Sequence, residues 1–174
     1  MPFFPSLPDD AGIGHLWSIN PALKRPMNDL GQAIMRADSP LSAAQREFIA
    51  AFVSALNNCD YCFKGHVQMA ANLGADRNQI AAAAADLDSA PIADDWREML
   101  RFLRKLTLTP AAMQQSDADA VYASGWNERA LHDAILVCCR FNFMNRLSLG
   151  HGLDSDGVSP ETRAAKMSYA QPAQ

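Results

Sequence analysis

Residues 42–66 read SAAQREFIAAFVSALNNCDYCFKGH, and this stretch decides the fold because it holds two helix signals in succession. Ser42, followed three residues later by Gln45, is a capping-box pattern, which predicts that a helix begins here. The pair Asn57-Asn58 breaks that helix. A second helix is expected to begin at Cys59 or the next residue, so that two cysteines stand in its first turns.

Helix is expected along nearly the whole chain, which makes all-α the predicted fold class. Residues that favour helix dominate, and β-branched runs with a period of two are missing. The first expected helix begins at Pro21 after Asn20, carries Leu23, Met27, Leu30 and Ile34 on one stripe, and ends at residues 37–40. The others are the helix from Cys59 to Leu73, a short one at 80–86 capped by Asp76, one at 96–108, a short one capped by Ser116, and the longest at 128–149 capped by Asn127.

Length and composition indicate one soluble domain of ordinary size. The chain has 174 residues and a formal charge of −4, and 20% of its residues are charged, with both signs scattered. This pattern offers no basic surface to nucleic acid, and no apolar run approaches the roughly 20 residues of a membrane span. Residues 1–8 lack the features of a secretory signal, so a cytoplasmic location is expected. Within the single domain 1–174, residues 154–174 are expected to form an extended, poorly packed tail.

The cysteine pair Cys59 and Cys62 is the first candidate for chemistry. In a reducing compartment, two cysteines at this spacing are more often catalytic or metal-binding than structural. On one helix face they lie about 5–6 Å apart, within reach of a disulfide. The unpaired N–H groups and the dipole at the start of a helix stabilise a thiolate, which is the form that attacks a peroxide.

His66 and Glu47 are the candidate proton carriers beside the thiols. His66 stands four residues after Cys62, on the same helix face, where its imidazole can accept the thiol proton. If the two helices form an antiparallel hairpin, Glu47 lies ~16 Å and His66 ~12 Å from the turn. The carboxylate could then reach the imidazole directly or through one water, orienting it as a relay partner.

Other interpretations of these residues stay open at this point. Cys59, Cys62 and His66 could bind a structural zinc ion, with a fourth ligand among His15, His132 and His151. Against zinc, there is no second ligand pair at finger-like spacing. Tyr61 and Phe63 are expected to be packing residues, with Tyr61 a weaker candidate for contact with substrate. Cys138 and Cys139 are expected to be buried core thiols. Helix-end or oligomer contacts are the first interpretation of Asn142, Asn145 and Arg146, and lining of the site is the second.

The spacing of Glu47, eleven residues, Cys59, two residues, Cys62, three residues and His66 resembles a known family pattern. It is similar to the alkylhydroperoxidase D (AhpD)-like, peroxidase-related branch of the carboxymuconolactone decarboxylase superfamily. The matching motif, from Glu47 to His66, covers about 20 residues, and the segment at 141–146 looks similar too.

The resemblance implies an AhpD-like helical bundle with the cysteine motif at the start of a central helix, assembled as a homo-oligomer (dimer, trimer or hexamer). It also implies an antioxidant enzyme that reduces hydroperoxides by a dithiol–disulfide cycle. Carried over, Cys62 attacks the peroxide, Cys59 resolves the sulfenic acid, and His66 with Glu47 moves the proton.

Two features qualify what the resemblance implies. The founding peroxidases have a histidine between the cysteines, where this chain has Tyr61. The decarboxylases of the superfamily do not rely on a cysteine pair, so having both cysteines argues against that activity.

No flavin, nicotinamide or haem signature is visible, so we expect no cofactor and an external dithiol or protein reductant. A protein disulfide reductase without peroxide turnover is the alternative enzyme, and a zinc-stabilised interaction module is the alternative outside enzymes.

Overall fold

The computed structural model describes residues 1–154 and 159–165, and every regular element within them is helical. The longer helices are α2 (Lys24–Arg36), α3 (Ala43–Leu56), α4 (Asp60–Asn72), α5 (Arg77–Ala85), α6 (Asp94–Leu108), α7 (Gln115–Ala123) and α8 (Glu128–Gly150). The shorter elements are α1 (Ile13–Leu16), α9 (Pro160–Ala165) and the 3₁₀ turns η1 (Pro21–Leu23) and η2 (Pro110–Ala112). The predicted all-α class is confirmed.

The α3–α4 hairpin forms where the opening stretch of sequence predicts it. Ser42 Oγ accepts from the backbone N–H of Gln45 at 3.1 Å, and Gln45 Oε1 accepts from the backbone N–H of Ser42 at 2.9 Å, which closes the capping box. Asn57 ends α3, and Asn58 takes a left-handed conformation with φ of 53°. This turn lets the chain reverse at once, and Cys59 becomes the N-cap of α4.

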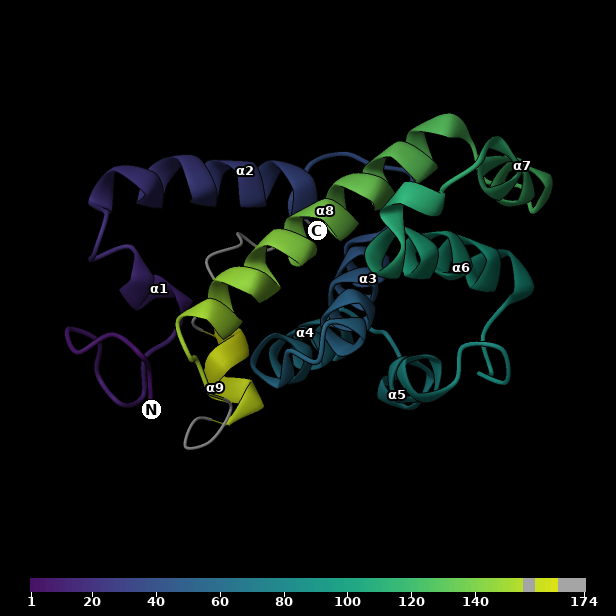
Figure 1. Cartoon of the computed structure of the whole chain (residues 1–174). Helices are drawn as coiled ribbons and strands as arrows, with labels where there is room; N and C mark the ends of the chain where they lie inside the picture. The colour runs from purple at the N-terminus through teal and green to yellow at the C-terminus, as the bar shows by residue number, and fades with distance from the viewer. Residues whose placement is uncertain (155–158, 166–174) are drawn as a thin grey trace.

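The core of the molecule is built around α3. Helices α4, α5, α6 and α8 all pack against it, and Figure 1 shows α8 crossing the hairpin, with α2 to one side and α6 and α7 to the other. Ile49 and Phe52 of α3 are almost fully buried, together with Leu100 of α6 and Phe141 of α8. Each such side chain contributes roughly 1.5–3 kcal/mol by leaving water, so α3 is held from several directions.

Four helix starts differ from the sequence-based expectation, and one of them is that of α6, which begins at Asp94 after the N-cap Ala93 and not at Trp96. The chain from Pro21 first makes the η1 turn, so the α-helix itself begins only at Lys24. Helix α5 begins at Arg77, before the expected residue 80, because Asp76 caps it by accepting from Asn78 N–H at 2.8 Å. The expected cap of α7 was wrong, since Ser116 lies inside that helix.

Gln114 is the N-cap of α7 instead. Its backbone N–H donates to Asp117 Oδ2 at 2.7 Å, so the acidic side chain three residues on satisfies the helix start. The N-caps expected at Asp76 and Asn127 are confirmed, since each side chain accepts a hydrogen bond from the following turn.

Helix α2 packs on the core along part of the expected apolar stripe. Met35 and Gly31 are buried, and Met27 and Ile34 of the stripe pack against the core, whereas Leu23 and Leu30 are about half exposed. The stripe is therefore confirmed at Met27 and Ile34 but not at Leu23 and Leu30. Helix α2 lies against both α3 and α8.

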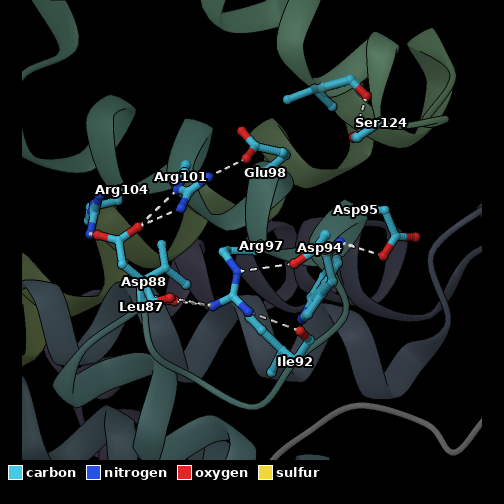
Figure 2. Close-up of polar contacts among 12 residues, drawn as sticks. Leu87, Asp88, Ile92, Asp94, Asp95, Arg97, Glu98, Arg101, Arg104 and Ser124 are labelled. Atoms are coloured by element: carbon cyan, nitrogen blue, oxygen red, sulfur yellow. Dashed lines mark hydrogen bonds and ion pairs between the residues drawn. The ribbon is translucent and has the colours of Figure 1, made fainter.

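Arginine side chains fasten the connection between α5 and α6. Arg97 donates to the backbone carbonyls of Leu87 at 2.6 Å and of Ile92 at 3.1 Å, as Figure 2 shows. Arg101 pairs with Asp88 at 2.7 Å on the outer surface. The contacts of Arg97 satisfy backbone carbonyls of the irregular segment between α5 and α6, which are not bonded within a helix.

The N-terminal segment and α9 both lie near the start of α4 and the end of α8 (Figure 1). Leu7, Leu16 and Leu153 form a small second core, and α9 packs on α4. The Phe4 ring stacks on His151 with centroids 4.5 Å apart. Part of the expected tail, residues 155–158 and 166–174, lies outside the described residues. Among those that are described, no helix is both long and apolar enough to cross a membrane.

Candidate active site

The two cysteines of the motif lie side by side as free thiols at the start of α4. Cys59 is fully buried and Cys62 is 5% exposed. The Cys62 sulfur also lies 3.5 Å from Ser148 Oγ, a hydroxyl on the last turns of α8. The reactive pair therefore sits between α4 and α8, almost out of contact with solvent.

The two thiols differ strongly in acidity. The Cys59 thiol donates a hydrogen bond to the Cys62 sulfur, and this bond, with Ser148 and the nearby charge of His66, lowers the pKa of Cys62 to about 6 against the opposing effect of burial. The same hydrogen bond and burial raise the pKa of Cys59 far above its usual range. Cys62 is thus the more acidic thiol of the pair, and the hydrogen bond from Cys59 favours its thiolate form.

Glu47 and His66 make the contact that the hairpin geometry predicts. His66 Nδ1 lies 2.6 Å from Glu47 Oε2, and both side chains are buried. The Phe141 ring packs edge-on against the imidazole, with centroids 4.3 Å apart. Carboxylate and aromatic ring together leave the imidazole little freedom to rotate, which suits a group that must hand over a proton in one direction.

Arg36 is a site residue that sequence reasoning missed. Its Nη2 lies 2.5 Å from Glu47 Oε1, the carboxylate oxygen that does not face His66. Both side chains are at most 2% exposed. No local pattern marks Arg36, because the contact depends on how the end of α2 meets α3.

Asn145 links the thiols to a buried polar network. It is fully buried, its Nδ2 donates to Ser54 Oγ at 2.9 Å, and its Oδ1 accepts from Asn57 Nδ2 at 3.0 Å. Its side chain also hydrogen-bonds both cysteines, which favours their charged forms. Lining of the site is only the second interpretation of Asn145 from the sequence, whereas the structure brings its side chain into contact with both cysteines.

Tyr61, between the two cysteines, is engaged by both ends of the chain. Its hydroxyl accepts from the backbone N–H of Ile13 at 3.0 Å, and its carbonyl accepts from Arg163 Nη1 at 2.8 Å. The Arg163 guanidinium also lies over the Tyr61 ring, 4.3 Å from its centroid. A Cβ on Gly12 would stand 2.9 Å from the tyrosine hydroxyl, so only glycine fits there without displacing it.

The remaining cysteines behave differently from each other. Cys138 is buried, and burial raises its pKa to about 11, as expected of a core thiol. Cys139 is exposed, so its expected burial was wrong, because adjacent side chains on α8 are rotated by about 100° around the helix and Cys138 takes the buried position. Within residues 1–154 and 159–165, no group of three or more His, Cys, Asp or Glu side chains is placed to hold a metal ion.

Comparison with known proteins agrees with the motif. Residues 21–105 match the family model named "Carboxymuconolactone decarboxylase family". This segment spans Glu47, both cysteines of the motif and His66. A comparison with curated proteins gives no match.

Several solved structures share the fold. An uncharacterized peroxidase-related protein from Silicibacter sp. TM1040 is 26% identical with a TM-score of 0.75, over 82% of this chain and 74% of its own. An uncharacterized peroxidase-related protein from Ralstonia eutropha JMP134, described as an alkylhydroperoxidase AhpD core, is 22% identical with a TM-score of 0.76, over 82% of this chain and 75% of its own. The debrominase Bmp8, solved with 2,3,4-tribromopyrrole, is 19% identical with a TM-score of 0.71, over 86% of this chain and 78% of its own. The predicted resemblance to AhpD-like proteins and the helical fold are confirmed.

Proposed function

We propose that this chain is a thiol-dependent peroxidase that reduces hydroperoxides through a dithiol–disulfide cycle of Cys59 and Cys62. The observation that carries the proposal is the free cysteine pair, hydrogen-bonded to each other and buried beside the Glu47–His66 contact. The match to the carboxymuconolactone decarboxylase family and the peroxidase-related neighbours support an antioxidant role.

In the first half of the cycle the Cys62 thiolate attacks the terminal oxygen of a hydroperoxide, ROOH. The S–O bond forms, the O–O bond breaks, and the leaving RO⁻ takes a proton from the His66 imidazolium to give ROH. Cys62 is left as the sulfenic acid. Its lowered pKa supports this role, because a thiolate is the attacking form and an acidic thiol is charged at neutral pH.

In the second half Cys59 resolves the sulfenic acid. The Cys59 sulfur gives up its proton, attacks the Cys62 sulfur and expels hydroxide, which leaves as water after protonation, so the pair ends as a disulfide. Two thiols have then lost two electrons to one hydroperoxide. An external dithiol must return the two electrons by thiol–disulfide exchange, and the burial of both sulfurs favours a small dithiol over a reduced protein.

The burial of the pair favours a small substrate. Cys62 is 5% exposed and Cys59 is fully buried, so a protein disulfide would need a large opening to reach either sulfur. A hydroperoxide needs far less room. This geometry favours peroxide reduction over the alternative of a general protein disulfide reductase.

The test is hydroperoxide consumption by purified protein with an excess of a small dithiol. We expect wild type to consume an organic hydroperoxide, and Cys62→Ser to reduce this to the uncatalysed rate. Cys59→Ser should give at most one turnover and accumulate a sulfenic acid that a dimedone-type reagent traps. Cys139→Ser is the matched control, because it removes an exposed cysteine on another helix and should leave the rate unchanged.

Two results would overturn the proposal. One is a Cys62→Ser variant as active as wild type. The other is a folded, fully reduced wild type that consumes no hydroperoxide yet exchanges rapidly with a protein disulfide, which would identify the reductase instead.

A further inference from the structure

The Glu47 carboxylate is shared between two elements, and one of them is not part of the cysteine hairpin. Arg36, the last residue of α2, binds Glu47 Oε1 through Nη2 at 2.5 Å, while His66 Nδ1 occupies Oε2 at 2.6 Å. Arg36 Nη1 also donates to the carbonyl of Met35 at 2.8 Å. The guanidinium is thus held at two points, and one of them is the carboxylate.

We propose that Arg36 is a positioning residue that sets the tautomer of His66 by acting through Glu47. This inference rests on the proposed function for the importance of His66, although its contacts exist whatever the substrate. Arg36 does not touch the thiols or a substrate, so its effect is on which ring nitrogen of His66 carries the proton.

The short contact between His66 Nδ1 and Glu47 Oε2 can hold its proton in two ways. Either Nδ1–H donates to a carboxylate, or a protonated carboxyl group donates to a bare Nδ1. A guanidinium is charged at every accessible pH, and beside it the ionised carboxylate is the favoured form. Arg36 therefore selects the first arrangement, in which Nδ1 carries the proton and Nε2 is the free acceptor. Nε2 is then the nitrogen that takes and returns the proton.

The end of α2 is built to deliver the guanidinium. Arg46 Nη1 donates to the carbonyl of Ile34 at 3.2 Å and to that of Ala37 at 2.8 Å, on either side of Arg36 in the sequence. Arg46 directly precedes Glu47 on α3. Two neighbouring residues of α3 thus hold the end of α2. Arg46 binds backbone carbonyls there, and Glu47 binds the side chain of Arg36.

Among the described residues, the side chains that contact the Glu47 carboxylate are Arg36 and His66. On α8, Asp133 is occupied by Ser39 and Arg129, and Arg140 is also buried on that helix. The charged side chains of α6 bind the connection 86–93 and α7 at the outer surface, and Arg77 of α5 binds Gln68. On α4 the ionisable neighbours are the two thiols themselves.

The experiment measures the His66 tautomer by ¹⁵N NMR of the reduced protein at mildly alkaline pH, with His66→Gln to assign the signals. We expect wild type to show Nδ1–H as a single tautomer. Arg36→Met should lose this single form and show a mixture of tautomers, and Arg36→Lys should restore it in part, because lysine keeps the charge but not the second anchor. Arg25→Met is the matched control on the same helix, since its side chain is 92% exposed.

Peroxide turnover is the second readout, and it separates the two proposals. Arg36→Met should lower kcat by roughly 10²-fold with little change in KM, the scale of lost acid–base catalysis. If wild type has no peroxide activity while its tautomer follows Arg36 as expected, only the proposed function fails.

Two tautomer results would overturn the positioning role. One is a folded Arg36→Met protein that keeps the single Nδ1–H form. The other needs no variant: an Nε2–H tautomer in wild type would mean that Glu47, not His66, carries the shared proton.

Discussion

At the scale of single residues, the acidity of Cys62 gives the first prediction. Its pKa of about 6 means that it is a thiolate above that pH and a thiol below it, so peroxide consumption should fall as the pH drops through 6. Ser148→Ala removes a hydrogen bond to the thiolate and should move this midpoint upward by about one unit, since hydrogen bonds to charged groups are worth about 1.5–3 kcal/mol and one unit is 1.36 kcal/mol.

Ultraviolet thiolate absorbance measures the midpoint directly. A Cys139→Ser background removes the exposed thiol, and Cys138 stays protonated because burial raises its pKa to about 11. Ser124→Ala, which changes a serine at the C-cap of α7, serves as the control. A midpoint near the ordinary cysteine value in wild type would contradict the first prediction.

Glu47→Gln gives the second prediction, on stability. The substitution leaves the buried Arg36 guanidinium without its counter-charge, so it should destabilise the fold by about 3 kcal/mol, the cost of breaking a buried ion pair. Urea denaturation followed by circular dichroism measures this change.

The matched control for that variant is Glu98→Gln. Glu98 pairs with Arg101 on the partly exposed surface shown in Figure 2, where an ion pair is worth about 0–1 kcal/mol. Equal losses for the two variants would mean that the Arg36–Glu47 pair has no special energetic role.

At the scale of elements, the sequence predicts the helix starts, helix ends and turns that depend on residues close together in the chain. The capping box at Ser42, the asparagine break and the glycine after α4 are local signals, and the hairpin they predict is confirmed, together with the Glu47–His66 contact. Ser116 failed as a cap because Gln114 and the side chain of Asp117 provide an earlier start, and the local pattern does not choose between them.

Contacts between distant elements could not be predicted in the same way. Arg36 ends an expected helix and resembles a solvated arginine in the sequence. Its partner belongs to another helix, and the residues around Arg36 do not determine the angle at which the two helices pack. Asn145 has the same difficulty, since its partners Ser54 and Asn57 lie about ninety residues away. The neighbouring cysteines and the Glu47–His66 contact could therefore be predicted, but not the residues that surround them.

Gly12→Ala gives the third prediction, on how α1 is docked. The added methyl would lie 2.9 Å from the Tyr61 hydroxyl, which is held by Ile13 N–H and by Arg163 over its ring, so one of these contacts must break. We expect faster amide hydrogen exchange in residues 7–16 and little change in α3.

Gly14→Ala is the control for that variant, because a methyl there meets nothing within 4 Å. Equal exchange in the two variants would show that the Tyr61 contact does not hold the N-terminal segment. Peroxide turnover measured on the same pair of proteins would show whether docking of this segment affects the thiols.

At the scale of the whole molecule, we propose that the chain forms a homo-oligomer. Leu136, Cys139 and Phe143 are exposed at helical spacing on one face of α8, where they form an apolar stripe suited to contact with a second copy of the chain. Phe143 is half exposed, and Phe143→Arg should weaken self-association in sedimentation velocity.

The control for the assembly prediction is Tyr122→Arg, a partly exposed aromatic residue on α7 away from the stripe. A wild type that sediments only as a monomer at all protein concentrations would contradict the proposal. So would an oligomer that Phe143→Arg leaves intact.

The docking of Tyr61 between the two chain ends also bears on how the protein is made. Ile13 is synthesised before the cysteines, whereas Arg163 follows Tyr61 by 102 positions, so the surroundings of the thiols are complete only once residue 163 has been made. A nascent chain that has finished α3 and α4 carries both cysteines without Ser148, whose hydrogen bond helps to lower the pKa of Cys62, and without Arg163. The full acidity of Cys62 is therefore reached only after α8 has packed on α4.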